Sequence, residues 1–512
     1  MRKKFTRAHV EHAFLVVLTL FFLLGGAWYI IHGDITYISD IARDFLVFEE
    51  IAVKKLVLLG PRASGMPGMF HGPLWEYLNF PAYMLGKGNP VTVGWFWAVL
   101  SGIYVASITF LTKKVFSTRA GLIAGVIASA QMVGYTQQLF NPYGALFIFP
   151  LLWYSAYQYY MHRKLVYAVL LWFVVGAMIQ FQMAVGVPMA ILCLVPFFFL
   201  LKQNKLWVHA VSIFAMVPFL LSWLLFDVRH AGQLTSALIH YFTVKDPGRV
   251  FYSLFELVNM RSSVLFSRAF RIYPTLFDGL NMLAAVSATT VFFLEHTHWR
   301  REKVIAWYTA LYLYVGYFAV SIAHNGWLME HYYLPLIPVA VILFASLLDA
   351  SKNKILWGVA IVALIINISV TYKFMSDARY NINWNKTSWQ VYNNMASNLL
   401  TKAKGDYGYF IYAPDVLGYQ LKYAFSYNEK RLGISNVRNH KAKVTYVVAE
   451  PVPKDAPGLS VDWWIVNKLK IESPPFLITP LANNHMLYEF HLTDEEITQS
   501  HDVDIDNWLH DR

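Results

Sequence analysis

The sequence predicts a polytopic α-helical membrane protein with about 11 transmembrane helices and a C-terminal extracytoplasmic α/β domain. Of its 512 residues, 57% are hydrophobic and only 14% are charged, whereas ordinary soluble domains have roughly 45–50% apolar and about 25% charged residues. Long runs with almost no charge recur as far as Tyr372, and polar residues return beyond it. This imbalance indicates that most of the chain lies in lipid.

The apolar segments, extended by their neutral flanks, approach the roughly 20 residues that a helix needs to cross a bilayer. They are Ala13–Ile31, Val91–Thr112, Gly121–Val133, Ala145–Tyr160, Leu165–Ile179, Val185–Leu201, Trp207–Phe226, Leu276–Leu294, Val304–Ile322, Tyr332–Leu348 and Ile355–Tyr372. The first is long and has no small-residue cleavage site before HGDITY, so we expect a retained anchor and not a signal peptide. The single cysteine, Cys193, excludes an intrachain disulfide.

The Lys and Arg residues of the short loops predict the orientation in the membrane. Alternate loops carry them, beginning with Arg2, Lys3, Lys4 and Arg7, whereas GYTQQLFNPYG, QFQMA and HNGWLMEH have none. We therefore expect a multi-pass protein of the cell membrane with a cytoplasmic N-terminus and an extracytoplasmic C-terminal domain. This bias accounts for most of the net charge of +11, so the charge gives no reason to expect nucleic acid as a partner.

Two domains are predicted. Residues 1–372 form the transmembrane domain, with extracytoplasmic loops 32–90 and 227–275, and residues 373–512 form the soluble α/β domain. In the soluble domain, WNKTSWQVYNNMASNLLTKAKG has helical periodicity and a C-cap candidate in Gly405. The segments YGYFIYA, KVTYVVAE and HMLYEFHL are β-branched and aromatic, as strands are, and DVLGYQLKYAF and VDWWIVNKLK are predicted helices.

An amphipathic helix is predicted directly after the first span. In ISDIARDFLVFEEIAVKKL, Ile41, Phe45 and Phe48 share one helical face, and Ser39 is a reasonable N-cap. We expect the apolar face of this helix to lie at the membrane interface, against lipid or other spans.

Three charges lie at the start of this helix. Asp40 and Asp44 are four residues apart and project from the same side, with Arg43 beside them. One interpretation is a set of surface pairs, each contributing a few tenths of a kcal/mol. The other is a functional site, and the next segment favours it.

Residues 58–81, LLGPRASGMPGMFHGPLWEYLNFP, are rich in Gly, Pro and Met, which predicts irregular structure that is buried in protein or lines an aqueous cavity. Arg62 and His71 are its distinctive polar groups, with Glu76 just beyond. A cationic pair near an acidic pair suits a reaction of a phosphorylated sugar. A carboxylate would take a proton from the attacking hydroxyl, and cations would stabilise the departing phosphate.

Four motifs in this order resemble the GT-C superfamily of membrane glycosyltransferases, in particular its bacterial protein-mannosyltransferase-like and aminoarabinose-transferase-like branch. SDIARD, with Asp40 as the leading acid, is similar to the acidic motif of the first external loop. FHGPLWEYL is similar to the aromatic element that follows, with His71 at its basic position. NPYGALFIFPLLWY resembles the opening of the fourth span, and MEHYYLPLIP resembles the late external loop.

The resemblance implies a polyprenyl-phosphate-linked sugar donor, inversion at the anomeric carbon, and a lipid, glycan or protein acceptor outside the cytoplasm. It implies Asp40 as the general base. The implied residues for holding the donor phosphate, or for orienting the groups that do, are Arg43, Asp44, Arg62, His71 and His331. Secondary candidates are Glu76, Asn141, Tyr143, Arg261, Arg268 and Tyr332.

The sequence departs from the family pattern at two places. Ile41 stands where the second acid of the first motif is common, and Asn141, Pro142 and Tyr143 stand where many relatives carry an Asp. Divalent hard cations prefer several carboxylate oxygens. We therefore expect no cofactor and do not favour a divalent metal.

Alternatives remain at this level. The basic residues of loop 227–275 are typical of contacts with anionic lipid headgroups as well as of a binding role. A transporter or lipid flippase would carry charges within its spans, and these spans are nearly free of them. A polysaccharide polymerase or ligase would share the lipid-linked donor, and in a non-catalytic receptor the first loop would be structural.

Overall fold

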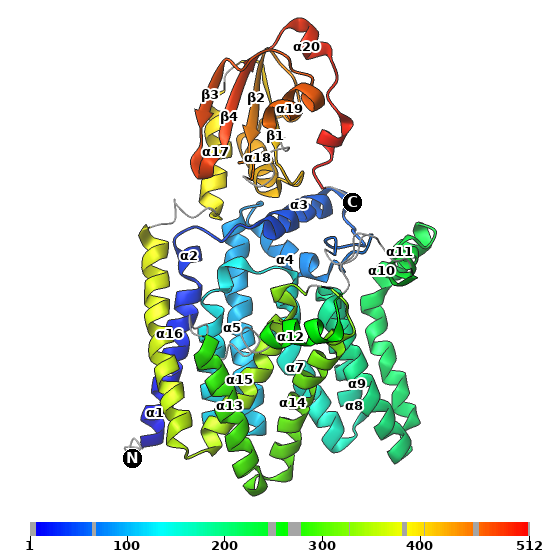
Figure 1. Ribbon diagram of the computed structural model, residues 1–512, viewed down its shortest axis with the longest axis vertical. Helices are drawn as coiled ribbons and strands as arrows, with labels where there is room; N and C mark the ends of the chain where they lie inside the picture. Colours follow the sequence, from blue (N-terminus) through cyan, green and yellow to red (C-terminus); the bar gives the residue numbers. More distant parts are fainter. Residues whose placement is uncertain are drawn as a thin grey trace. The chain divides into compact units, whose positions relative to one another are not determined.

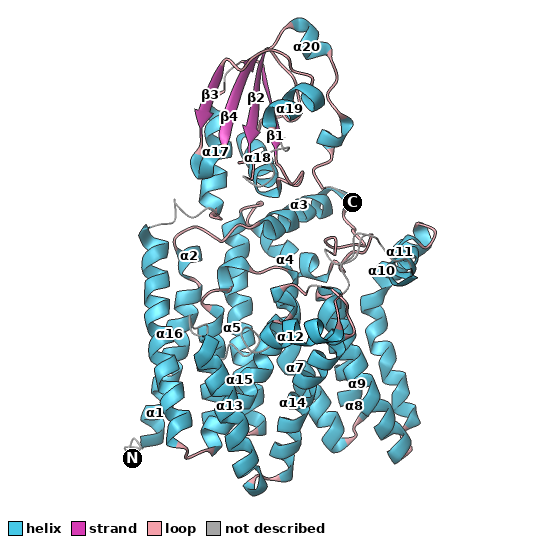
Figure 2. Ribbon diagram, viewed as in Figure 1, coloured by secondary structure: helices cyan, strands magenta, loops and turns pink. Residues whose placement is uncertain are grey.

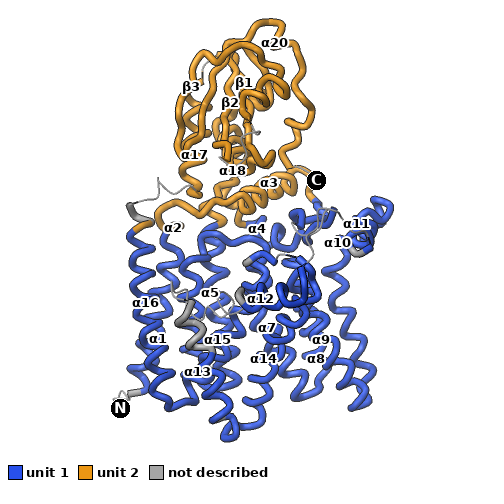
Figure 3. The backbone as a smooth tube through the Cα atoms, viewed as in Figure 1, with its two compact units in different colours: residues 1–28, 56–81, 94–376 blue, residues 29–55, 82–93, 377–512 orange. Residues whose placement is uncertain are grey.

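The computed structural model describes residues 7–63, 68–243, 252–264, 278–326, 328–380, 387–403, 405–453 and 460–509. The chain divides into two compact units (Figure 3). The helical unit comprises residues 1–28, 56–81 and 94–376, and the sheet unit comprises residues 29–55, 82–93 and 377–512. The sheet unit thus includes two segments from the N-terminal part of the chain, and the predicted domain boundary at residue 372 stays a prediction.

Each predicted apolar segment is mostly helical in the residues that the structure describes (Figure 2). The corresponding elements are α1 (Arg7–Gly26) with α2 (Trp28–Ile31), α5 (Pro90–Val115), α6 (Thr118–Met132), α7 (Asn141–His162), α8 (Leu165–Phe181), α9 (Met183–Asn204), η2 (Trp207–Met216) with α10 (Val217–Arg229), α13 (Asp278–Glu295), α14 (Arg301–Ile322), η5 (Glu330–Tyr332) and η6 (Leu334–Leu336) with α15 (Ile337–Ala350), and α16 (Lys354–Tyr380). Within the described residues, 6 helices are long and apolar enough to cross a membrane. The fold is therefore that of a mostly helical polytopic membrane protein, and the number of about 11 spans stays a prediction.

Close helix packing in the helical unit depends on small residues. Helix α6 packs against α1 and α15 and is buried along most of its length. A Cβ atom added to Gly121 would lie 2.6 Å from the carbonyl oxygen of Thr109 in α5, and one added to Gly125 would lie 2.5 Å from the Thr109 hydroxyl. Small residues at these positions let helix backbones approach closely, as is usual in membrane proteins.

The sheet unit contains a mixed sheet of four strands in the order β1-β2-β4-β3 (Figure 1). Strands β1 (Tyr407–Tyr412) and β2 (Val444–Ala449) are parallel, and β4 (Met486–His491) is antiparallel to both β2 and β3 (Leu477–Pro480). The three predicted strands are confirmed. Strand β3 was not predicted, because four residues ending in proline give too short a pattern.

Helices cover both faces of this sheet. Tyr409 of β1 contacts Phe425 of α18 (Tyr419–Leu432), with ring centroids 4.5 Å apart, and α18 packs against α17 (Trp389–Lys402). The next residue, Phe410, points to the other face and joins a core with Ile465 and Leu469, which follow α19 (Val461–Trp464). Both predicted connecting helices are present.

One predicted helix end is wrong. Helix α17 ends at Lys402, because Ala403 already has an extended backbone, with φ −62° and ψ 130°. Gly405 does adopt a positive φ of 76°, three residues beyond that end. The glycine therefore shapes the turn into β1 and does not cap the helix.

Asp34 joins the segment after α2 to the start of α17. The carboxylate is buried, and one of its oxygens accepts a hydrogen bond from the Ser388 hydroxyl at 2.5 Å. The other accepts from the backbone N–H groups of Ile35 at 2.9 Å and Gln390 at 3.1 Å. Burial raises the pKa of Asp34 to about 6. These hydrogen bonds lower the pKa of Asp34 and desolvation raises it, and the effect of desolvation is the larger.

The amphipathic helix α3 (Ser39–Lys54) lies in the sheet unit and packs against α18. The rings of Phe45 and Tyr423 are 5.0 Å apart, and the Glu49 carboxylate accepts from the Ser426 hydroxyl at 2.8 Å and pairs with Lys430 at 2.7 Å. The apolar face of α3, which was expected to lie against lipid or other spans, thus contacts aromatic residues of the sheet unit.

The predicted N-cap of α3 is wrong. Ser39 is the first helical residue, and Ile38 occupies the N-cap position without a side-chain hydrogen bond to the helix. The first turn instead carries Asp40, whose charge suits the positive end of the helix dipole.

The prediction of irregular structure throughout residues 58–81 is also only partly right. Helix α4 (Leu74–Leu85) covers the end of this segment and contains Pro81. The apolar run LWEYLNF provides enough helical residues before the proline to form the helix.

We predict that Ser388→Ala lowers the free energy of unfolding by about 1–3 kcal/mol, because it removes a donor from a buried carboxylate oxygen. The folded-state pKa of Asp34 is raised, so its protonation stabilises the fold below about pH 4, and this contribution is lost as the pH rises through about 6. The Ser388 hydroxyl favours the ionised form of Asp34, so its removal should lower the free energy of unfolding more at pH 8 than at pH 5. Thermal unfolding at the two pH values measures this difference.

Thr401→Ala is the matched control, since its exposed hydroxyl donates to the Ser397 and Asn398 carbonyls of its own helix. An equal loss of stability in the two variants, or a loss for Ser388→Ala that does not change with pH, would contradict the role assigned to Asp34.

Candidate functional site

The charged group on the first turns of α3 is held by one arginine. Nη1 of Arg43 donates to Asp40 at 2.7 Å, and Nη2 and Nε donate to one oxygen of Asp44 at 3.0 and 3.3 Å. The Asp40 side chain is 43% exposed, whereas that of Asp44 is 4% exposed. Asp44 therefore orients Arg43 from the buried side, and Asp40 presents a carboxylate to solvent. The predicted proximity is observed, and the roles stay predictions.

Arg62 and His71 lie on a short hairpin-like loop of the helical unit. The N–H of Gly60 donates to the His71 carbonyl, and the N–H of His71 donates to the Pro61 carbonyl, both at 2.8 Å. Arg62 forms an antiparallel bridge with Phe70. The Arg62 side chain is exposed and that of His71 is buried. These bonds hold the described ends of the loop together, and Arg62 and His71 differ in their access to solvent.

The end of α8 connects this loop to the start of α7. A Cβ atom on Gly72 would lie 1.8 Å from Oε1 of Gln180, so the loop passes α8 at a distance that only glycine allows. Nδ2 of Asn141, the first residue of α7, donates to the Phe181 carbonyl at 2.8 Å. Glu76, in the first turn of α4, is fully buried. The ring of Trp75, the residue before Glu76, is 6.4 Å from the Phe181 ring, so three segments that carry predicted residues meet around Gln180 and Phe181.

The start of α7 also contacts the late loop. The Phe140 ring is 5.4 Å from the His331 ring and 5.5 Å from the Tyr143 ring, measured between centroids. His331 in turn contacts Tyr332 at 4.6 Å, and the Tyr317 hydroxyl donates to the Tyr332 carbonyl at 3.1 Å. The predicted residues Tyr143, His331 and Tyr332 thus belong to one aromatic cluster.

Arg261 has a structural setting. It lies in α12 (Leu254–Val264) and is buried, and its guanidinium donates to the carbonyls of His324 at 3.0 Å and Gly326 at 2.6 Å. These carbonyls follow the end of α14, where unpaired acceptors need donors. A buried guanidinium does not fit the headgroup contact considered for this loop. Arg268 lies outside the described residues.

Phe140, Gln180 and Phe181 were not selected from the sequence. Gln180 and Gln182 flank Phe181 at a junction of two apolar helices, where two amides in succession are a usable signal. An aromatic residue such as Phe140 gives no such signal, because most of the aromatic residues here are packing residues.

In the described part of the chain, no group of three or more His, Cys, Asp or Glu side chains is placed to hold a metal ion. The expectation that the protein needs no divalent metal stays a prediction.

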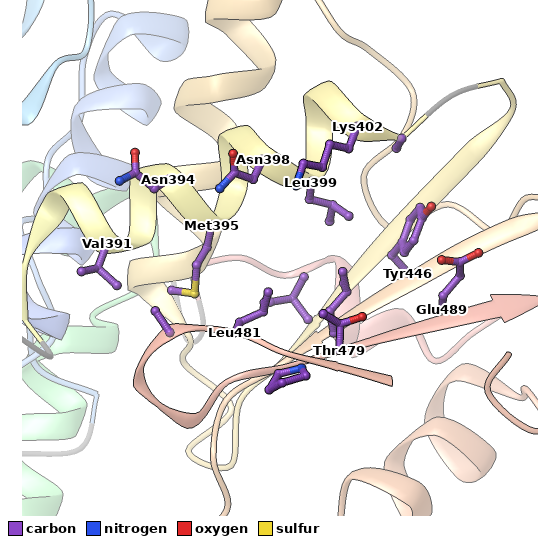
Figure 4. Close-up of a pocket in the computed structure, with 15 residues that line it drawn as sticks. Val391, Asn394, Met395, Asn398, Leu399, Lys402, Tyr446, Thr479, Leu481 and Glu489 are labelled. Atoms are coloured by element: carbon purple, nitrogen blue, oxygen red, sulfur yellow. The ribbon is translucent and has the colours of Figure 1, made fainter. Parts of the chain in front are cut away.

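A cavity of about 610 Å³ lies in the sheet unit between α17 and strands β2, β3 and β4. Figure 4 shows Met395 and Leu399 pointing from α17 towards Leu481, while the amides of Asn394 and Asn398 point away. The centre of the cavity is therefore apolar. None of the catalytic or binding residues predicted from the sequence lines this cavity.

No protein-family model matches the sequence, and no curated protein matches it. The structure is similar to that of ArnT from Cupriavidus metallidurans. The crystal structure of ArnT bound to undecaprenyl phosphate matches with a TM-score of 0.61 and 12% sequence identity, over 94% of this chain and 98% of the ArnT chain. The apo structure of ArnT matches over the same shares of the two chains, with a TM-score of 0.59 and 12% identity. The oligosaccharyltransferase of Archaeoglobus fulgidus in complex with Zn and sulfate is less similar, with a TM-score of 0.48 and 13% sequence identity, over 85% of this chain and 68% of that chain.

The ArnT match covers the chain almost from end to end and confirms the predicted GT-C resemblance at the level of the fold. At this identity it establishes no activity.

We predict that Arg43→Ala lowers the free energy of unfolding by about 2–3 kcal/mol, because it removes charge-assisted donors from the nearly buried Asp44. Lys54→Ala is the matched control on the same helix. It breaks the pair with Glu50, but the Lys54 side chain is 64% exposed, so we expect less than about 0.5 kcal/mol. Thermal unfolding of both variants tests this difference, and equal effects would show that Arg43 is an ordinary surface residue.

Proposed function

We propose that this protein is an inverting glycosyltransferase that moves a sugar from a polyprenyl-phosphate-linked donor to an acceptor on the extracytoplasmic side of the cell membrane. The fold shared with ArnT over 94% of the chain is the observation that carries the proposal. That ArnT structure holds undecaprenyl phosphate, a lipid phosphate of the class proposed as the donor carrier. The bias of Lys and Arg in the loops supports a cytoplasmic N-terminus and an extracytoplasmic C-terminal domain.

Asp40 is the general base of this proposal. Its partial exposure leaves room for an acceptor hydroxyl, and the hydrogen bond from Arg43 orients the carboxylate. Asp40 takes the hydroxyl proton while the acceptor oxygen attacks the anomeric carbon from the side opposite the phosphate. The bond from that carbon to the phosphate oxygen breaks, polyprenyl phosphate departs, and the anomeric configuration inverts.

The donor phosphate needs cationic side chains that can stabilise its charge. Arg43 is shared between two carboxylates, so we assign it, with Asp44, to orienting Asp40. Arg62, which is exposed, and His331, in the aromatic cluster, are the leading candidates for the phosphate, and His71 is a third. Asn141, Tyr143, Tyr332 and Glu76 are secondary candidates, and Arg261 is assigned to structure by its bonds to carbonyls.

We predict that Asp40→Asn lowers the rate of transfer from a polyprenyl-phosphate sugar by about 100-fold or more, because an amide cannot accept the hydroxyl proton. The measurement is transfer by the purified protein in lipid, with thermal unfolding as the check on folding. Glu50→Gln removes a carboxylate from the same helix and should leave the rate unchanged. A correctly folded Asp40→Asn protein with the wild-type rate would remove Asp40 from the mechanism.

We predict that transfer continues in the presence of a chelator such as EDTA, because fewer acids are available than a divalent cation prefers. The assay compares the purified protein before and after chelation. Loss of transfer that magnesium or manganese restores would overturn this expectation without affecting the assignment of Asp40.

A further inference from the structure

A second cavity in the sheet unit lies beyond the carboxyl end of β1 and has a volume of about 370 Å³. Its walls come from the residues after β1, from α18 and α19, and from η10 (Val503–Asp506). The carboxyl ends of parallel strands are a common place for ligands, because the connections that leave the sheet there diverge. The cavity lies entirely within one unit and shares no residue with the proposed transferase site.

Three tryptophans line this cavity. Trp464 packs edge-on against Tyr412, with centroids 5.3 Å apart, and Trp508 carries the Arg438 guanidinium 3.8 Å above its ring. Trp463 remains 55% exposed. Large aromatic rings are usually covered in folded domains, and open ones in a pocket mark binding sites. A flat indole face matches the apolar C–H face of a sugar ring.

The polar groups near the cavity are nearly balanced in charge. Lys422 is buried, its Nζ donates to the Val416 carbonyl at 3.3 Å, and burial lowers its pKa to about 8 despite the nearby Asp415 and Glu450. Burial raises the pKa of Glu450 to about 7.

Elsewhere in the wall, Lys468 pairs with Asp502 at 2.5 Å, and Asp504, Asn439 and Ser460 also line the cavity. With each lysine matched by acids, the cavity offers no excess positive charge to a phosphate or a polyanion. It offers aromatic faces together with hydrogen-bonding groups, which is the combination that hydroxyl-rich neutral molecules require.

We propose that this cavity binds an uncharged saccharide, with Trp463 stacking on a sugar ring and Lys422 donating hydrogen bonds to its hydroxyls. The inference concerns binding only and does not depend on the transferase proposal.

The test measures binding of a panel of uncharged oligosaccharides, built from glucose, mannose, galactose or N-acetylglucosamine, to the full-length protein by saturation-transfer NMR. The protein is held in lipid nanodiscs, because sugar-headed detergents would compete. At least one oligosaccharide should bind, and Trp463→Ala should weaken its binding by about tenfold or more, as expected when a central aromatic contact is lost. Trp463→Phe, which keeps a smaller ring, should weaken binding less.

Phe476→Ala is the matched control, since Phe476 is 67% exposed in the same unit and does not line the cavity. Asp40→Asn should also leave saccharide binding unchanged, which separates this inference from the transferase proposal. The inference is overturned if no member of the panel binds or if Trp463→Ala binds as well as the wild type. Tighter binding of a sulfated or phosphorylated oligosaccharide would overturn the assignment of an uncharged ligand.

Discussion

The buried carboxylate of Asp34 is the constraint on which the sheet unit depends. It accepts hydrogen bonds from the Ser388 hydroxyl and from the backbone N–H of Gln390. Ser388 lies 354 positions after Asp34 in the sequence. A carboxylate removed from water is costly unless donors surround it, so few arrangements of these two segments are tolerated. Because Asp34 lies only a few residues before α3, this junction brings α3 into the unit that contains the sheet.

The docking of α3 decides which of its charges remain accessible. Phe45 contacts Tyr423, and both Phe45 and Phe48 contact Tyr83, so the rotation of α3 about its axis is fixed by aromatic packing. Asp40 and Asp44 are neighbours on an isolated helix, yet one is partly exposed and the other nearly buried. The difference in exposure fits the two proposed roles, proton transfer for Asp40 and orientation of Arg43 for Asp44.

In the helical unit, backbone and aromatic contacts hold together several segments that carry predicted polar residues. The Asn141 amide reaches the Phe181 carbonyl, Gly72 passes Gln180, and His331 packs on Phe140. These contacts join the first loop, the start of α7, the end of α8 and the late loop, which are far apart in sequence. Packing and hydrogen bonds of this kind hold the side chains of a binding site in a fixed geometry.

The sequence by itself determined the helices of the membrane part, three of the four strands, and the proximity of Asp40, Arg43 and Asp44. Each of these follows from spacing along a few turns of helix or a few residues of strand, because hydrophobic periodicity and i, i+3 and i, i+4 contacts are local. Only the tertiary structure decided the junction at Asp34, the burial of Arg261 against carbonyls, and the tryptophan-lined cavity. These features join segments whose partners are hundreds or dozens of residues away, and no local pattern encodes which of many similar polar or aromatic side chains will meet once the chain has folded.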